Sequence, residues 1–143
     1  MEEQRLKKLT YKVIGAAYEV RKTLGPYLYE NTYEIALQKE LELRGIKAIR
    51  QHPIKIIYKG IEIDHAKALD LLVEDEIAIE LKALDFMGSH EMRQLLSYMK
   101  FGNFRIGYLM NFGAKDFCPG IFRERDSYMD KGIYRFVNNI SDK

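Results

Sequence analysis

Cysteine is almost absent from this chain of 143 residues, because Cys118 is the only one. A lone thiol cannot form an internal disulfide or a cysteine-rich zinc site, and it fits a reducing compartment. No two of the histidines, His52, His65 and His90, have a spacing typical of zinc ligands, such as His-x3-His. The sequence therefore excludes disulfide scaffolds and provides no support for a structural zinc site.

Long apolar runs are also missing. No stretch approaches the roughly 18 consecutive apolar residues of a membrane-spanning helix. The first ten residues, MEEQRLKKLT, lack the apolar core of a secretory signal. We therefore expect a cytoplasmic protein with no membrane partner.

The chain has no large excess of positive or of negative charge. The 23 Lys and Arg residues face 21 Asp and Glu residues, for a formal net charge of +2. This is too weak to indicate nucleic-acid binding over the whole surface, although a local basic strip could still bind phosphates. The N-terminal segment offers such a strip, and the more common interpretation is a solvated helix face; its cations are Arg5, Lys7, Lys8, Lys12, Arg21 and Lys22.

The apolar pattern predicts a single α/β domain over residues 1–143. Hydrophobic residues make up 47% of the chain and charged residues 31%, which is typical of a globular protein. Three- and four-residue spacing predicts helices over 4–23, 29–44 and 89–101. Strands are predicted over 54–58, 61–73, 76–83, 104–110 and 133–137, with an irregular segment over 111–130. This order predicts a mixed central sheet flanked by helices, with a parallel pair on either side of helix 89–101.

Two apolar runs meet at the polar break Glu74-Asp75-Glu76, which predicts a hairpin that turns at Asp75. Pairing the residues across this turn places Asp70 opposite Glu80, about 5 Å apart at Cβ. Lys82 follows two residues after Glu80 and projects from the same face of its strand. Two acids and one lysine are therefore expected to share a site.

Opposed carboxylates repel each other, and one of the two should stay protonated unless a cation lies between them. Mg²⁺ binds one or two carboxylates and keeps several waters, which leaves positions for phosphate oxygens. The neighbouring ammonium of Lys82 could orient a water or stabilise developing negative charge. The alternative is a wet strand face with a surface ion pair. The apolar context Ile-Ala-Ile-Glu-Leu-Lys weighs against it, because charges in a central strand require partners.

Three further residues are candidates for the same site. Glu30 opens the second helix, one turn before Tyr33, so it should face inward; the alternative role is to complement the helix dipole. Gln94 and Tyr98 are four residues apart in helix 89–101 and so share a side. Taken singly, both residues are also compatible with packing or surface roles.

At these residues the chain resembles the GxxExxY family of the PD-(D/E)XK nuclease superfamily. The resemblance reaches from the N-terminus to about Phe112, and its anchors are residues 24–33, 40–46, 70–75, 80–83 and 90–98. The name-giving Glu and Tyr fall on Glu30 and Tyr33. The superfamily's catalytic positions fall on Asp70, Glu80 and Lys82, and its helix motif falls on Gln94 and Tyr98.

The resemblance implies a restriction-endonuclease-like core and a nuclease that uses Mg²⁺ or Mn²⁺ to hydrolyse DNA or RNA. Asp70, Glu80 and the Leu81 carbonyl would hold the metal, and a homodimer would allow cleavage of two strands. The chain departs from the family pattern in three places. Tyr27 occupies the name-giving glycine position, and residues 66–68 read Ala-Lys-Ala where the family often has Gly-aromatic-Arg. Residues 113–130 are also longer than the usual ending of the family. These departures keep two alternatives open: a non-catalytic nucleic-acid-binding module and a protein-interaction module on the same fold.

Overall fold

The computed structural model describes residues 2–63, 67–123, 126 and 128–138. Within them it contains three helices, α1 (Glu2–Leu24), α2 (Glu30–Leu43) and α3 (Ser89–Gly102). It also contains eight strands: β1 (Ala48–Pro53), β2 (Ile56–Tyr58), β3 (Ile61–Ile63), β4 (Ala68–Val73), β5 (Ile77–Lys82), β6 (Ile106–Asn111), β7 (Asp116–Gly120) and β8 (Lys131–Val137). None of the described helices has an apolar stretch long enough to cross a membrane.

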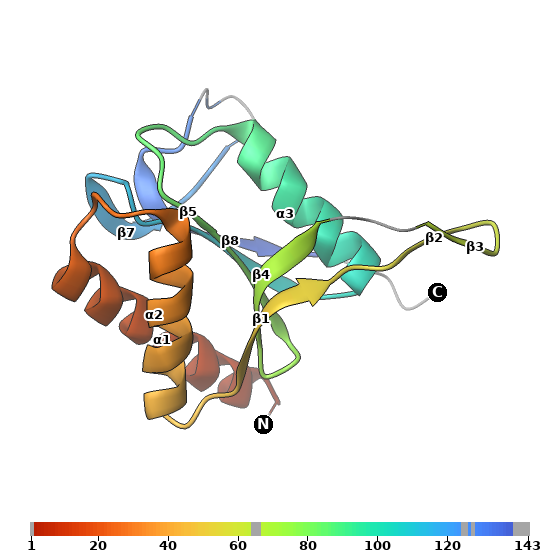
Figure 1. Cartoon of the computed structure of the whole chain (residues 1–143), viewed down its shortest axis with the longest axis horizontal. Coiled ribbons are helices and arrows are strands. Elements are labelled where there is room, and N and C mark those ends of the chain that lie inside the picture. Colours follow the sequence, from red (N-terminus) through yellow and green to blue (C-terminus); the bar gives the residue numbers. More distant parts are fainter. Residues whose placement is uncertain (1, 64–66, 124–125, 127, 139–143) are drawn as a thin grey trace.

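Six of the strands form one mixed sheet in the order β1-β4-β5-β6-β8-β7. Helices α1 and α2 lie on one face of this sheet and α3 lies on the other (Figure 1). Strands β5 and β6 are parallel neighbours with α3 between them in the chain. The predictions of a mixed sheet flanked by helices, and of a parallel crossover around helix 89–101, are confirmed.

The predicted hairpin between β4 and β5 is present in the expected register. Leu71 pairs with Ile79, Leu72 with Ala78 and Val73 with Ile77. Its turn has positive φ at Glu74 and Asp75, 51° and 59°, as in the type I′ turns whose twist matches that of paired strands. Leu71, Val73, Ile77 and Ile79 pack towards α1 and α2, whereas Leu72 and Ala78 pack towards α3, as does Leu69 on the other side of Asp70. From Leu71 to Ile79 the alternation of apolar residues thus fixes which face each side chain occupies.

Three strand predictions were wrong in part. The predicted strand 54–58 begins only at Ile56, and β1, which precedes it, was not predicted. The predicted strand 61–73 is two strands, β3 and β4; residues 64–66, with His65 and Ala66, lie outside the described part of the chain. The predicted irregular segment 111–130 contains β7. Both unpredicted strands form the edges of the main sheet, where proline is tolerated and the apolar pattern is weak.

Strands β2 and β3 form a separate two-stranded hairpin around a turn at Lys59-Gly60, where both residues have positive φ. It extends away from the body of the protein (Figure 1).

Two apolar cores stabilise the six-stranded sheet and its helices. The core under α1 and α2 includes Val13, Leu37, Leu71 and Ile79, and the core under α3 includes Leu95, Met99 and Leu109.

Candidate active site at the ends of strands β4 and β5

The pairing of β4 with β5 runs from the turn as far as Leu71 and Ile79. Beyond these two residues, at Asp70 and Glu80, carboxyl groups accept hydrogen bonds from the backbone. The backbone N–H of Asp70 donates to Oε1 of Glu80 at 3.0 Å. The backbone N–H of Leu81 donates to Oδ2 of Asp70 at 2.9 Å. Each carboxyl group is therefore fixed by the backbone of the opposite strand. This is the juxtaposition of Asp70 and Glu80 that the hairpin predicts.

Both carboxyl groups are buried, with relative exposures of 8% for Asp70 and 3% for Glu80. Burial, followed by the negative charge of Asp70, raises the pKa of Glu80 to about 8. Burial, followed by the charges of Glu34 and Glu30, raises the pKa of Asp70 to about 6, against the opposing hydrogen bond from Leu81. The pair therefore retains a proton near neutral pH in the absence of a cation.

Lys82 links this acidic pair to helix α3. Its Nζ donates to Oε1 of Gln94 at 3.0 Å and lies 3.8 Å from Oε2 of Glu80. Nε2 of Gln94 in turn donates to the Tyr98 hydroxyl at 3.3 Å. Burial, followed by the charge of Glu80, raises the pKa of Tyr98. The structure thus brings Gln94 and Tyr98 to the strand residues, in a chain of contacts that runs from Tyr98 to Glu80.

Glu30 approaches from the opposite face of the sheet, as the first residue of α2. Its carboxyl group is partly buried, and this burial raises its pKa. The charge of Lys82 opposes that shift and the charge of Glu34 adds to it. All six side chains that the sequence predicts for the site therefore lie together, between the N-terminus of α2 and the middle of α3.

Three neighbours were not predicted. Glu34, one turn after Glu30, is a buried acid with 3% exposure. Its carboxylate accepts from Nε of Arg50 at 2.7 Å and from Nε2 of Gln51 at 2.9 Å. Gln51 Nε2 also lies 3.4 Å from Oδ1 of Asp70, so it links Glu34 to the acidic pair. The spacing from Glu30 could have revealed Glu34, but Arg50 and Gln51 lie on the unpredicted strand β1.

The backbone of Gln51 explains how β1 reaches the site. Gln51 has a φ of 54°, a left-handed conformation that is uncommon for residues other than glycine. In the register of β1 and β4 it stands opposite Asp70, between the pairs Arg50–Leu71 and His52–Leu69. Such conformations cost on the order of 1–3 kcal/mol and cluster at functional sites. Here the conformation accompanies the contact of the Gln51 amide with two carboxylates.

The donor set fits a hard divalent cation that keeps part of its water shell. Asp70 and Glu80 each have one carboxylate oxygen outside the two backbone hydrogen bonds. The Leu81 carbonyl faces β4, as its N–H does, because the two groups of a strand residue point to the same neighbour. Across the described ranges no three or more His, Cys, Asp or Glu side chains are arranged as a metal cage. The donors that could hold an ion here are the two free carboxylate oxygens and the Leu81 carbonyl, and water would have to complete the coordination.

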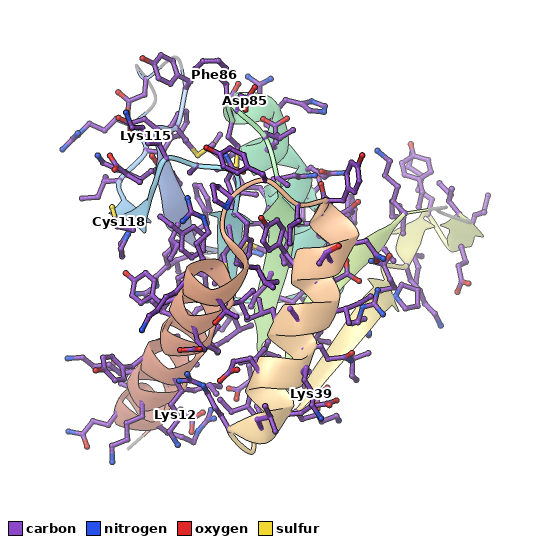
Figure 2. The ribbon with its side chains drawn as sticks, turned by 60° about the vertical axis from the view of Figure 1, so that its left-hand side comes forward. Lys12, Lys39, Asp85, Phe86, Lys115 and Cys118 are labelled. Atoms are coloured by element: carbon purple, nitrogen blue, oxygen red, sulfur yellow. The ribbon has the colours of Figure 1, made fainter. Side chains whose placement is uncertain are left out.

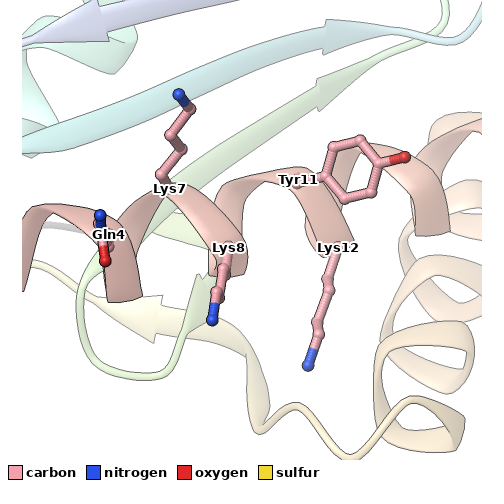
Figure 3. A pocket seen from close by; sticks show the side chains of 5 residues that line it. All are labelled: Gln4, Lys7, Lys8, Tyr11 and Lys12. Carbon is pink, nitrogen blue, oxygen red and sulfur yellow. The ribbon is translucent and has the colours of Figure 1, made fainter.

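A surface hollow of about 530 Å³ lies away from these residues, along the exposed side of α1. Figure 3 shows the side chains that line it, which are Gln4, Lys7, Lys8, Tyr11 and Lys12. The three lysines among them are half of the six cations in the basic strip noted in the sequence. In Figure 2, Lys12 and Lys39 lie at one end of the protein, and Asp85 and Phe86, which follow β5, lie at the other. None of the described residues that line the hollow carries a carboxylate, so it lacks the acidic ligands that a hard divalent cation prefers.

The chain matches the model of the PD-(D/E)XK nuclease superfamily over residues 7–124. The match includes every residue described above as part of the candidate site. Comparisons with curated proteins and with solved structures gave no significant match.

Proposed function

Because the chain belongs to the PD-(D/E)XK nuclease superfamily, we propose that it is a metal-dependent nuclease that hydrolyses the phosphodiester bonds of nucleic acids. One observation carries this proposal. Asp70 and Glu80 are buried side by side, each held by the other's strand, with the Lys82 ammonium 3.8 Å from Glu80. Such crowding of acids is costly, and a divalent cation would relieve it.

In this proposal Asp70, Glu80 and the Leu81 carbonyl hold Mg²⁺ or Mn²⁺. The ion would neutralise phosphate charge and lower the pKa of a water. Lys82 positions the attacking water and stabilises negative charge that develops on the phosphate. The hydrogen bond from the Lys82 ammonium to Gln94 holds the ammonium in place. Gln94 is held in turn by its hydrogen bond to the Tyr98 hydroxyl. Glu30 would orient a water on the side of α2.

Within the superfamily we assign the chain to the GxxExxY group, on the residues Glu30 and Tyr33. The buried Tyr33 supports this assignment through its contacts. Its hydroxyl donates to the Gly25 carbonyl and accepts from the N–H of Leu28 at 3.1 Å. Tyr33 therefore holds the loop that leads into Glu30, which gives this tyrosine a physical reason to accompany the glutamate.

A non-catalytic nucleic-acid-binding module is the second candidate. The sequence of residues 66–68 favours it, because they read Ala-Lys-Ala where the family often has Gly-aromatic-Arg. Such a module would bind nucleic acid equally well with and without a metal, whereas a nuclease would cleave it.

Thermal unfolding in Mn²⁺ and in EDTA tests the proposed metal site. An ion present at about 100 times its dissociation constant stabilises the folded state by about 2.7 kcal/mol. We expect Mn²⁺ to raise the unfolding temperature of the wild type but not of Asp70→Asn or Glu80→Gln. Asp116→Asn is the matched control, because it removes an exposed acid of β7 that is paired with Lys131 of β8. This variant should keep the full shift in unfolding temperature. An equal shift in Asp70→Asn would place the ion elsewhere.

A further inference from the structure

Three aromatic side chains are exposed on two loops that flank the candidate site, and a fourth, Tyr128, contacts one of them from the segment before β8. Tyr27 and Tyr29 lie between α1 and α2, with exposures of 94% and 86%. Phe86 lies between β5 and α3 with an exposure of 76%, and Tyr128 contacts its edge at a ring-centroid distance of 6.2 Å. We call these four residues the aromatic rim. Figure 1 shows the two loops close to each other at the upper left of the molecule.

The rim is attached directly to the residues of the site. Tyr29 precedes Glu30, the first residue of α2, and Phe86 follows Lys82 by four positions. The first loop is tied down through the Tyr33 hydroxyl, which bonds Gly25 and Leu28. The Tyr33 ring stacks on Phe112 at 4.7 Å, so this loop is joined to the end of β6.

The second loop is joined to the same strand end. Asn111 stands opposite Lys82 in the sheet and precedes Phe112. Its side chain accepts from the N–H of Leu84 at 2.9 Å and donates to the Leu84 carbonyl at 3.0 Å. Tyr33, Phe112 and Asn111 therefore fix both loops relative to Lys82, and the rim presents its rings from an anchored backbone.

Exposed aromatic rings beside a site that acts on phosphodiesters are suited to stacking on nucleobases. Every nucleobase has a π-face on which an aromatic side chain can stack, and this face is free only where the base is unpaired. The charges point the same way. Lys82 and Arg50 lie beside the carboxylates of Glu80 and Glu34, and the net charge of the chain is +2. These two cations already offset negative charge of the protein itself, so stacking on bases can add what phosphate contacts do not supply.

From this placement we propose that the aromatic rim binds unpaired bases by stacking, and that the site acts on single-stranded nucleic acid. The proposal rests on the proposed nuclease function for the identity of the bond that is cleaved. The stacking surface is Tyr27, Tyr29 and Phe86, with Tyr128 supporting the ring of Phe86. Stacking recognises bases in DNA and in RNA, so the shared feature is the unpaired base.

Fluorescence anisotropy in EDTA tests the binding step without cleavage. The probes are a labelled single-stranded DNA, a single-stranded RNA of the same sequence, and a fully paired hairpin duplex. We expect the wild type to prefer the single strands, and Tyr29→Ala and Phe86→Ala each to weaken that binding by roughly 5- to 150-fold, the range for loss of one base–aromatic stack. Tyr29→Phe keeps the ring and should bind like the wild type. Tyr58→Ala, which removes a tyrosine that is 59% exposed on β2, outside the rim and the basic strip, is the matched control.

Equal affinity for the duplex and the single strands would overturn the proposal, as would unchanged binding by both alanine variants. The two single strands show which sugar the rim tolerates. Because the side chains of Tyr29 and Phe86 are more than three-quarters exposed, their variants should melt like the wild type. If Tyr29→Ala nevertheless melts earlier, the binding of Phe86→Ala to the single strands tests the proposal in its place. Phe86→Ala should then bind more weakly than Tyr29→Phe, which keeps its ring.

Cleavage in Mn²⁺ separates this proposal from the proposed function. If rim variants lose single-strand binding while the wild type cleaves nothing, the rim is supported and the nuclease is not. If the wild type cleaves duplex and single strands at equal rates, and the rim variants do the same, the nuclease is supported and the rim is overturned.

Discussion

The backbone N–H of Asp70 donates a hydrogen bond to Oε1 of Glu80, while the carboxylate of Asp70 accepts one from the N–H of Leu81. Each acid is thus held by the backbone of the opposite strand at the point where both are buried. Lys82 and Glu30 contribute charges of opposite sign around the same point. The predictions below follow from this arrangement and from the neighbours that support it.

Asp70→Asn separates a metal site from a structural acid. In EDTA at pH 8 we expect the variant to be at least as stable as the wild type, because one of two repelling buried charges is gone. The amide oxygen of Asn can still accept from Leu81. Denaturant unfolding of both proteins measures the difference. If Asp70 instead stabilises the fold through a charged hydrogen bond, the variant will lose about 1–3 kcal/mol, and the non-catalytic alternatives become preferable.

The metal-free protein should lose stability as the pH rises. Burial raises the folded-state pKa of Asp70 to about 6 and that of Glu80 to about 8, above their ordinary values of 3.8 and 4.5. Between about pH 4 and pH 8 the folded state therefore binds more protons than the unfolded state, and the free energy of unfolding falls with increasing pH. Unfolding in EDTA at pH 5 and pH 8 measures this. Glu80→Gln should reduce this dependence of the unfolding free energy on pH. An unchanged dependence would contradict the statement that Asp70 and Glu80 retain a proton near neutral pH.

Arg50→Met should destabilise the protein by about 2–4 kcal/mol, since it removes the cation partner of the buried Glu34 carboxylate. The double variant Arg50→Met/Glu34→Gln should recover part of the loss, because no buried charge is then left without its cation. Arg44→Met, which breaks the more exposed pair with Glu40, is the control and should change stability by less than about 1 kcal/mol. Equal losses in the two single variants would show that Glu34 is not the reason.

Tyr33→Phe should lower stability by about 1–2 kcal/mol, because it removes the hydroxyl that bonds Gly25 and Leu28 but keeps the ring on Phe112. Hydrogen exchange at the Leu28 amide should quicken in the variant. Tyr11→Phe, on the exposed side of α1, provides the reference for a tyrosine hydroxyl outside this loop. Unchanged exchange at Leu28 would mean that the loop does not depend on Tyr33.

Much of the arrangement around Asp70 follows from the sequence. The alternation of apolar residues on either side of Glu74-Asp75-Glu76 predicts the register of β4 and β5, and four-residue spacing predicts that Gln94 and Tyr98 share a side of α3. These are local patterns in which each residue contributes to the same apolar face. The acids therefore come together because the hydrophobic residues around them allow only one pairing.

The parts that the sequence did not predict depend on non-local structure. Strand β1 pairs with β4 across 15 to 25 residues of chain, and its polar residues have the composition of a loop. The left-handed backbone of Gln51 has no signature in its residue type, and this conformation accompanies its contacts with Glu34 and Asp70. Strand β7 contains Pro119 and Gly120, which are typical of turns but are tolerated at a sheet edge.

A cleavage assay of the wild type and Lys82→Ala, purified in the same way, tests the proposed nuclease most directly. The substrates are single-stranded and duplex DNA and RNA, in Mg²⁺, Mn²⁺, Ca²⁺ or EDTA, and Lys131→Ala, which removes a lysine paired with Asp116 outside the site, is the matched control. We predict cleavage by the wild type and by the control in Mg²⁺ or Mn²⁺, little turnover in Ca²⁺, and loss of cleavage in Lys82→Ala. No cleavage by the wild type, or equal cleavage by the wild type and Lys82→Ala, would contradict the assignment of this site.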